Sequence, residues 1–169
     1  MDSNELRAIQ APFKERYRTE PQAALVTLRA SGALDSTTIA CKVDTGRALS
    51  VAGLHPATGG SGAELCSGDM LLEALVACAG VTLRAVSTSL GISVTSGRVR
   101  AEGDLDFRGT LGVDRTAPVG FSAIRLSFEL DTEADEGELE TLRRLTERYC
   151  VVYQTLASGP DLSTSLVAV

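Results

Sequence analysis

The chain has 169 residues, of which 44% are hydrophobic, and this length supports one well-packed domain while being short for two independent cores. Its formal net charge of −6 argues against the broad positive field that draws proteins to nucleic acid or to anionic membranes. The polar and charged start, MDSNELRAIQAPFKERYR, lacks the apolar core of a secretory signal, so we expect a single cytoplasmic domain over residues 1–169.

The first part of the chain predicts one helix and then three strands. Residues 1–20 carry apolar side chains at helical spacing, which predicts an amphipathic helix that extends the domain at its N-terminus. Apolar runs of strand length follow, separated by turn residues that include glycine: Ala24 to Ala30, Thr37 to Val43 and Ala48 to Leu54. These three runs predict an antiparallel meander.

A long apolar helix is predicted near the middle of the sequence. The glycine-rich segment Pro56 to Gly68 is typical of a loop that leads into it, Ser67 is a candidate N-cap and Gly91 a candidate C′ residue. Between these signals, Met70 to Leu90 is apolar on nearly every face, as in a core helix. Its longest apolar part, Met70 to Val86, contains Glu73 and Arg84 and falls a little short of the ~20 residues of a membrane span, which favours a core helix over a membrane anchor.

Two further strands and a second helix follow the central helix. Ile92 to Phe107 and Gly120 to Asp131 have strand patterns, and the second alternates apolar and polar residues cleanly. Asp135 and Glu138 form a capping box, and an apolar stripe continues from there to Tyr149. This pattern predicts a helix that ends just before Cys150.

A last strand is predicted from Leu162 to Ala168, after the turn residues Ser158 to Pro160. The sequence therefore alternates groups of strands with buried helices, without the regular βαβ order of a parallel sheet. This arrangement predicts the α+β class.

Four cysteines are the residues best suited to chemistry: Cys41, Cys66, Cys78 and Cys150. Cytosolic reductants keep ordinary thiols reduced, so any disulfide here should be transient and functional. Cys41 alternates with apolar residues along a strand, which favours a core position. Cys66 lies in the loop before the central helix, where a helix dipole lowers a thiol pKa, although an unreactive loop cysteine is the alternative.

Cys78 lies in the middle of the predicted central helix, whereas Cys150 lies at the end of the second helix, where the chain changes direction. Cys78 shares one face of the central helix with Leu71, Leu75 and Thr82, so its thiol faces apolar side chains. A cysteine in such a place is often only a small hydrophobic residue, and the two positions form no CxxC motif. A reactive Cys78 needs a nearby cation, because apolar burial raises a thiol pKa.

Other kinds of site have little support in the sequence. His55 is the single histidine, so a catalytic triad or a two-histidine metal site would depend on that residue alone. The glycine run Gly59 to Gly62 lacks the lysine of a phosphate-binding loop. We expect no metal and no cofactor.

Two segments that contain Cys78 and Cys150 form recognisable patterns. Ser67 to Ile92, SGDMLLEALVACAGVTLRAVSTSLGI, is similar to the pattern P-x-E-L-L-x-A-x-x-A-C of the OsmC/Ohr family, the osmotically inducible protein C and organic hydroperoxide resistance proteins, with Cys78 in the place of the first cysteine. Tyr149 to Val169 resembles the second pattern, C-P-V-x-x-x-L followed by a closing strand. Cys150 takes the place of the second cysteine there.

The resemblance implies an OsmC-like fold, in which curved antiparallel sheets surround a long buried helix and two chains form an intertwined homodimer. It also implies a peroxidase in which Cys78 attacks an organic hydroperoxide and becomes a sulfenic acid, which Cys150 resolves as a disulfide that a dithiol reductant reopens. Leu71, Leu75 and Thr82 would then line the substrate site.

The sequence departs from the family pattern at the groups that activate the first cysteine. Asp69 stands where the family carries a glutamate, and Val151 replaces the proline after the second cysteine. The activating arginine has no counterpart in the motif, so Arg29 and Arg47 are the candidates. The alternative function is therefore a non-catalytic family member that binds a small apolar ligand in a pocket at the dimer interface.

Overall fold

The computed structural model describes residues 3–34, 41–43, 52–63 and 65–168. Their helices and strands, in chain order, are α1 (Ser3–Thr19), η1 (Pro21–Ala24), β1 (Leu25–Leu34), β2 (Cys41–Val43), β3 (Ala52–Gly53), η2 (Pro56–Thr58), β4 (Leu65–Cys66), α2 (Ser67–Leu90), β5 (Ser96–Asp106), α3 (Phe107–Thr110), β6 (Phe121–Asp131), α4 (Glu136–Tyr149) and α5 (Val151–Ala157).

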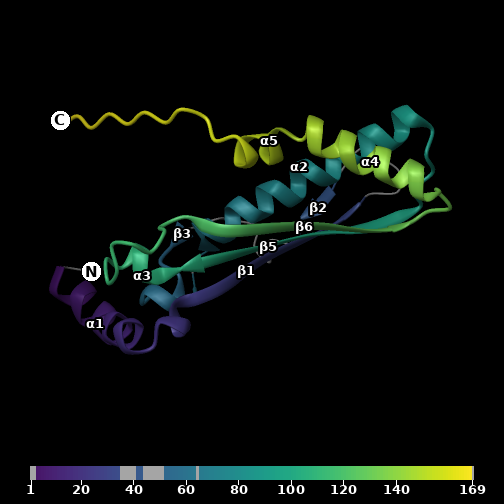
Figure 1. Cartoon of the computed structure of the whole chain (residues 1–169). Coiled ribbons are helices and arrows are strands. Elements are labelled where there is room, and N and C mark those ends of the chain that lie inside the picture. The colour runs from purple at the N-terminus through teal and green to yellow at the C-terminus, as the bar shows by residue number, and fades with distance from the viewer. Residues whose placement is uncertain (1–2, 35–40, 44–51, 64, 169) are drawn as a thin grey trace.

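The main sheet is antiparallel and has the order β2-β1-β5-β6. Helices α2, α4 and α5 lie along one face of this sheet, while α1 lies at the end of the sheet where β1 begins (Figure 1). Helix α2 packs against β1 and β5 below it and against α4 and α5 beside it. The arrangement confirms the predicted α+β class with a long central helix.

The N-terminal helix is confirmed, and it packs against the rest of the domain. Tyr17 is buried, and its hydroxyl donates to the carbonyl of Ala57 at 2.6 Å. Pro12 lies inside α1. The extension is therefore anchored by its C-terminal half.

The predicted three-stranded meander is wrong in two respects. Strand β1 continues through the expected turn at Ser31-Gly32, because Gly32 pairs with Val43 on one side and with Val99 on the other. Backbone pairing with both neighbours outweighs the turn preference of a single glycine. Residues 48–51 of the last predicted run lie outside the described residues, and Ala52–Gly53 pairs in parallel with Leu65–Cys66 in a separate two-stranded sheet instead of joining an antiparallel meander.

Helix α2 begins at Ser67, one turn earlier than Met70, and Ser67 lies within the helix instead of capping it. It ends as predicted at Gly91, which has φ 73° and therefore adopts the left-handed conformation that favours glycine. By length and composition α2 is apolar enough to cross a membrane, but half of its apolar window is buried inside the protein. Its most deeply buried side chains form one face: Leu72, Leu75, Val76, Ala79 and Leu83.

Strand β6 has the predicted two-residue alternation. Ile124, Leu126, Phe128 and Leu130 pack against the core, while the residues between them are exposed. The capping box at Asp135 and Glu138 is also formed, with the N–H of each residue donating to the side chain of the other. These local patterns therefore gave correct predictions.

The chain after Cys150 differs from the prediction. Residues 151–157 form helix α5, and the predicted strand Leu162 to Ala168 is not formed. Leu162 is 90% exposed and Leu166 is 99% exposed, and this tail extends away from the domain (Figure 1). A strand needs a neighbour to satisfy its backbone groups, and none of the described residues pairs with this segment.

Candidate functional site

The structure brings the thiols of Cys78 and Cys150 together. Cys78 lies in the middle of α2, and Cys150 lies between α4 and α5. The side chains of the two residues are hydrogen bonded to each other, and both cysteines are free thiols. Cys150 is completely buried, whereas Cys78 is partly buried.

The path of the chain explains why these two residues meet. At the end of α2, the N–H of Thr95 donates to the carbonyl of Asp131 at 2.9 Å and the hydroxyl of Thr132 donates to the carbonyl of Ser93 at 2.6 Å. These bonds hold the chain so that α4 begins beside the C-terminal end of α2. Helix α4 then runs antiparallel to α2 and ends beside its middle, where Cys150 is located (Figure 1).

Cys150 is both the C-cap residue of α4 and the N-cap residue of α5. Its backbone is extended, with φ −74° and ψ 108°, which breaks the helix and turns the chain. The N–H of Tyr153 donates to its Sγ atom at 3.4 Å. The first N–H groups of α5 are thereby directed toward the thiol pair.

The pKa of Cys78 lies below its usual value. Burial raises this pKa, but the hydrogen bonds made by the sulfur together outweigh burial, because they stabilise the thiolate. The donors, in order of their effect, are the N–H of Val152, the thiol of Cys150, the N–H of Val151 and the hydroxyl of Thr82. Backbone and neutral side-chain donors thus favour the thiolate here.

The pKa of Cys150 moves in the opposite direction. Burial and the neighbouring Cys78 raise it to about 11, although the N–H of Tyr153 acts against this shift. At neutral pH Cys150 is therefore protonated, and Cys78 is the thiol that ionises more easily. A thiolate is the nucleophilic form of cysteine, so this arrangement favours Cys78 over Cys150 as a nucleophile.

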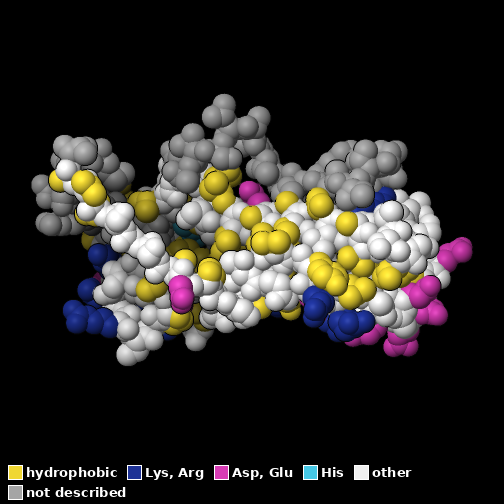
Figure 2. Space-filling model, turned by 90° about the horizontal axis from the view of Figure 1, so that it is seen from above, with side chains coloured by type: hydrophobic (Ala, Val, Ile, Leu, Met, Phe, Trp, Pro, Cys, Tyr) yellow, Lys and Arg dark blue, Asp and Glu magenta, His cyan; other side chains and the backbone are white. Residues whose placement is uncertain are grey.

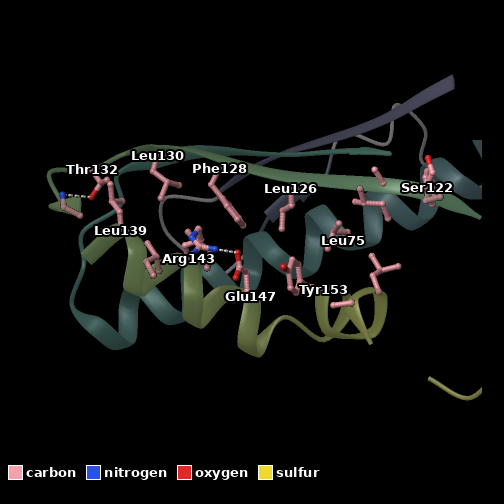
Figure 3. A pocket seen from close by; sticks show the side chains of 18 residues that line it. Leu75, Ser122, Leu126, Phe128, Leu130, Thr132, Leu139, Arg143, Glu147 and Tyr153 are labelled. Carbon is pink, nitrogen blue, oxygen red and sulfur yellow. Dashed lines mark hydrogen bonds and ion pairs between the residues drawn. The ribbon is translucent and has the colours of Figure 1, made fainter. Parts of the chain in front are cut away.

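An apolar groove of about 790 Å³ lies between β6 and the helices α4 and α5. Its walls are mostly aliphatic and aromatic and include Leu75, whereas neither Cys78 nor Cys150 is among the lining residues (Figure 3). Arg143 and Glu147 form a 2.5 Å ion pair in the α4 wall. Seen from the helix side, hydrophobic side chains gather in patches along the molecule, with basic residues beside them (Figure 2).

Leu75 and Tyr153 connect the groove to the thiols. Leu75 is three residues before Cys78 on α2, so the two side chains are neighbours on the helix surface. Tyr153 lines the groove and its N–H binds Cys150. Of the other residues predicted to bind substrate, Thr82 contacts the Cys78 sulfur, whereas Leu71 is 38% exposed and does not line the groove.

Asp69 lies away from the thiol pair. At about 100° per residue, Asp69 and Cys78 point to opposite sides of α2. Burial raises the pKa of Asp69 and nearby His55 lowers it, while the pKa of His55 is lowered by burial and raised by Asp69. Asp69 therefore interacts with His55, and its expected role in catalysis stays a prediction.

His55 itself has a structural setting. Its ring stacks on Phe107 with 4.9 Å between ring centroids, and its Nδ1 atom accepts from the N–H of Ala57 at 3.0 Å. Among the residues with described side chains, no group of three histidine, cysteine, aspartate or glutamate residues could hold a metal ion.

No arginine is placed beside the thiol pair by the described residues. Arg84 is buried and donates to the carbonyl of Val94, which ties α2 to the segment before β5. Arg47, and the side chain of Arg29, lie outside the described part of the structure. Within that part, no cation is among the groups that lower the pKa of Cys78.

The backbone donors at the start of α5 are the site groups that the sequence analysis missed. The only local signal for this short helix is the four-residue spacing of Val152 and Leu156, and cysteine is a weak N-cap signal. The role of the Val151 and Val152 N–H groups depends on how α4 packs on α2, which no local pattern reports.

Comparisons with known proteins agree with this fold. A sequence model described as OsmC-like protein matches residues 60–165. The solved structure of an OsmC-like hydroperoxide resistance protein from Jannaschia sp. CCS1 is similar, with a TM-score of 0.62 and 16% sequence identity over 86% of this chain and 95% of that one. A comparison with curated proteins gives no significant match.

Proposed function

Because this chain belongs to the OsmC-like protein family, we propose that it is a thiol-dependent peroxidase that reduces organic hydroperoxides. The observation that carries the proposal is the hydrogen-bonded pair of free cysteines in which the pKa of Cys78 is lowered and that of Cys150 is raised. One thiol is thus prepared to attack, and the other stays protonated beside it.

The chemistry proceeds in two steps. The Cys78 thiolate attacks the terminal peroxide oxygen, so that an S–O bond forms, the O–O bond breaks and the alkoxide leaves as an alcohol after taking up a proton. The sulfur is oxidised by two electrons and the peroxide is reduced by two. Cys150 then attacks the sulfenic acid sulfur, so that an S–S bond forms, the S–O bond breaks and water leaves. A dithiol reductant returns both cysteines to thiols.

The groove supports an organic substrate. Its aliphatic and aromatic walls favour a hydrocarbon group over hydrogen peroxide, because apolar surface gains about 25 cal/mol per Å² when it leaves water. Leu75 and Tyr153 line the groove; Leu75 is one helix turn from Cys78, and the N–H of Tyr153 donates to the Cys150 sulfur. A hydroperoxide with an apolar body can therefore lie in the groove with its peroxide group toward Cys78.

The active form that we propose is a homodimer. Leu162, Leu166 and Val167 in the C-terminal tail are 77% to 99% exposed, and β6 is an edge strand of the main sheet. Exposed apolar residues and an unpaired strand edge are each unfavourable in an isolated chain, and a second copy can cover both. The OsmC/Ohr resemblance gives the same expectation.

A second function is binding of a small apolar ligand without catalysis. The observation in its favour is that, in the described residues, the Cys78 sulfur receives hydrogen bonds from neutral groups and from no cation. The same 790 Å³ groove would hold the ligand.

Peroxide consumption by defined variants separates the two functions. The reduced protein is mixed with tert-butyl hydroperoxide, and thiols and disulfides are followed by mass spectrometry. We expect a Cys78–Cys150 disulfide, its loss in Cys78→Ser, and a trapped Cys78 sulfenic acid in Cys150→Ser. Cys66→Ser is the control, since Cys66 is also free and partly buried but lies at the start of α2. If Cys78→Ser consumes peroxide as fast as the unaltered protein, the peroxidase proposal is wrong.

A further inference from the structure

Thr146 has an unusual environment for a buried hydroxyl group. Among the described buried side chains, its Oγ1 atom is the oxygen or nitrogen that has no hydrogen-bond partner, and the residue is 1% exposed. Two hydroxyls of α2 bond back to a carbonyl of the preceding turn: Ser87 donates to Arg84 at 3.0 Å and Thr88 donates to Arg84 at 2.8 Å. Thr146 makes no such bond.

An unpaired hydroxyl in the core is unfavourable, with a cost of about 1–3 kcal/mol for the lost hydration. Such groups are rare in folded proteins, and the explanations for them include an ordered water, an ion and a role in catalysis. The environment of Thr146 therefore makes it a candidate functional residue. Its position in the fold indicates which group its hydroxyl can bind.

Thr146 lies one turn from the thiol pair. The N–H of Cys150 donates to the carbonyl of Thr146 at 2.9 Å, so both residues lie on the same face of the last turn of α4. Because α4 runs antiparallel to α2, the turn from Cys150 back to Thr146 lies beside the turn from Cys78 to Thr82. The hydroxyl of Thr82 already contacts the Cys78 sulfur.

We propose that Thr146 is a positioning residue of the thiol site, and that its hydroxyl donates a hydrogen bond to the oxygen atom that the peroxide leaves on the Cys78 sulfur. This inference rests on the peroxidase function proposed above. The reduced thiols have no oxygen for this bond, so the Oγ1 atom is unpaired until Cys78–SOH forms. The bond then holds the sulfenic acid with its sulfur toward Cys150 and stabilises the oxygen as it leaves in water.

The proposal separates the two chemical steps, because Thr146 acts only after the first. Attack of Cys78 on the peroxide should not depend on it, whereas disulfide formation should. The variant Thr146→Val keeps the shape of the side chain and removes the hydroxyl, and Thr146→Ser keeps the hydroxyl. Thr88→Val is the control, because it removes a helix hydroxyl that already has a partner in α2.

The test uses rapid mixing of the full-length reduced proteins with tert-butyl hydroperoxide, with dimedone added to trap sulfenic acid and mass spectrometry to count the products. For Thr146→Val we expect Cys78 to be oxidised at the rate of the unaltered protein, the Cys78–Cys150 disulfide to form about tenfold more slowly, and the dimedone adduct on Cys78 to accumulate. Thr146→Ser should restore most of the rate, and Thr88→Val should not change it.

Thermal melting distinguishes positioning from a structural role. Removal of an unpaired buried hydroxyl should leave the melting temperature of Thr146→Val equal to or above that of the unaltered protein. If this variant forms the disulfide at the normal rate, or if both steps slow equally, the inference is wrong while the peroxidase function stands. If the unaltered protein forms neither sulfenic acid nor disulfide, the proposed function fails and the inference fails with it.

Discussion

The sulfur atoms of Cys78 and Cys150 are hydrogen bonded although one residue lies in the middle of α2 and the other at the break between α4 and α5. The contact exists because α4 begins beside the end of α2 and returns along it. The break at Cys150 also directs the N–H groups of Val151 and Val152 toward Cys78. One turn in the chain therefore supplies both the second thiol and the donors that favour the first thiolate.

The two thiols should ionise at different pH. Hydrogen bonds lower the pKa of Cys78 despite its burial, whereas burial and Cys78 raise the pKa of Cys150 to about 11. Alkylation by iodoacetamide, followed residue by residue with mass spectrometry, should modify Cys78 near neutral pH and leave Cys150 unmodified. Cys150→Ala removes one donor and should move the Cys78 profile to higher pH. Equal profiles for the two cysteines would contradict the assigned roles.

Thr82 should influence the reactivity of Cys78 and have little effect on stability. Its hydroxyl donates to the Cys78 sulfur, so Thr82→Val raises the pKa of that thiol and reduces the thiolate fraction at pH 7. We expect alkylation and peroxide reduction at pH 7 to be several-fold slower, and to recover as the pH is raised. Thr82→Ser should behave like the unaltered protein. A loss that persists at high pH would indicate a packing defect instead.

Leu75 should matter for both stability and substrate binding. It is 1% exposed and lines the groove, so Leu75→Ala removes core contacts at a cost of about 2–5 kcal/mol. Urea unfolding should measure this loss, and the KM for a bulky hydroperoxide should rise. Leu71→Ala, at a position 38% exposed on the same helix, is the matched control and should change both values little.

Asp106 should make stability depend on pH in the acid range. Hydrogen bonds from Arg108 lower the pKa of this buried carboxyl, and the closest approach of the two side chains is 2.5 Å. A carboxyl whose pKa is lower in the folded than in the unfolded state stabilises the fold at pH values above the unfolded-state pKa. This stabilisation is lost as the pH falls through the folded-state pKa. Asp106→Asn should therefore lower the melting temperature by several degrees at pH 7 and much less at pH 2. An equal difference at both pH values would exclude a charge effect.

The C-terminal tail should control the oligomeric state. Removal of residues 159–169 deletes the exposed apolar side chains of the tail but none of the residues that line the groove. If the tail joins two copies, light scattering should give a dimer for the full chain and a monomer for the shortened one, with similar helix content by circular dichroism. A dimer of unchanged stability in the shortened protein would show that the tail is not needed.

The sequence by itself determined the elements whose signals are local. The alternation of Ile124 to Leu130, the capping box at Asp135 and Glu138, and the glycine that ends α2 were predictable because each depends on neighbours a few residues away. The family patterns around Cys78 and Cys150 also came from the sequence. They identified the two candidate positions without defining the environment of either thiol.

Only the tertiary structure decided the pairing of strands and the chemistry of the site. Gly32 remains in β1 because the strands on both sides pair with its backbone. Residues 162–168 form no strand because no described strand pairs with their backbone. The lowered pKa of Cys78 and the unpaired hydroxyl of Thr146 arise where α4 and α5 meet α2. Backbone pairing, burial and hydrogen bonds between distant segments depend on packing, and a local pattern carries no information about which segments pack together.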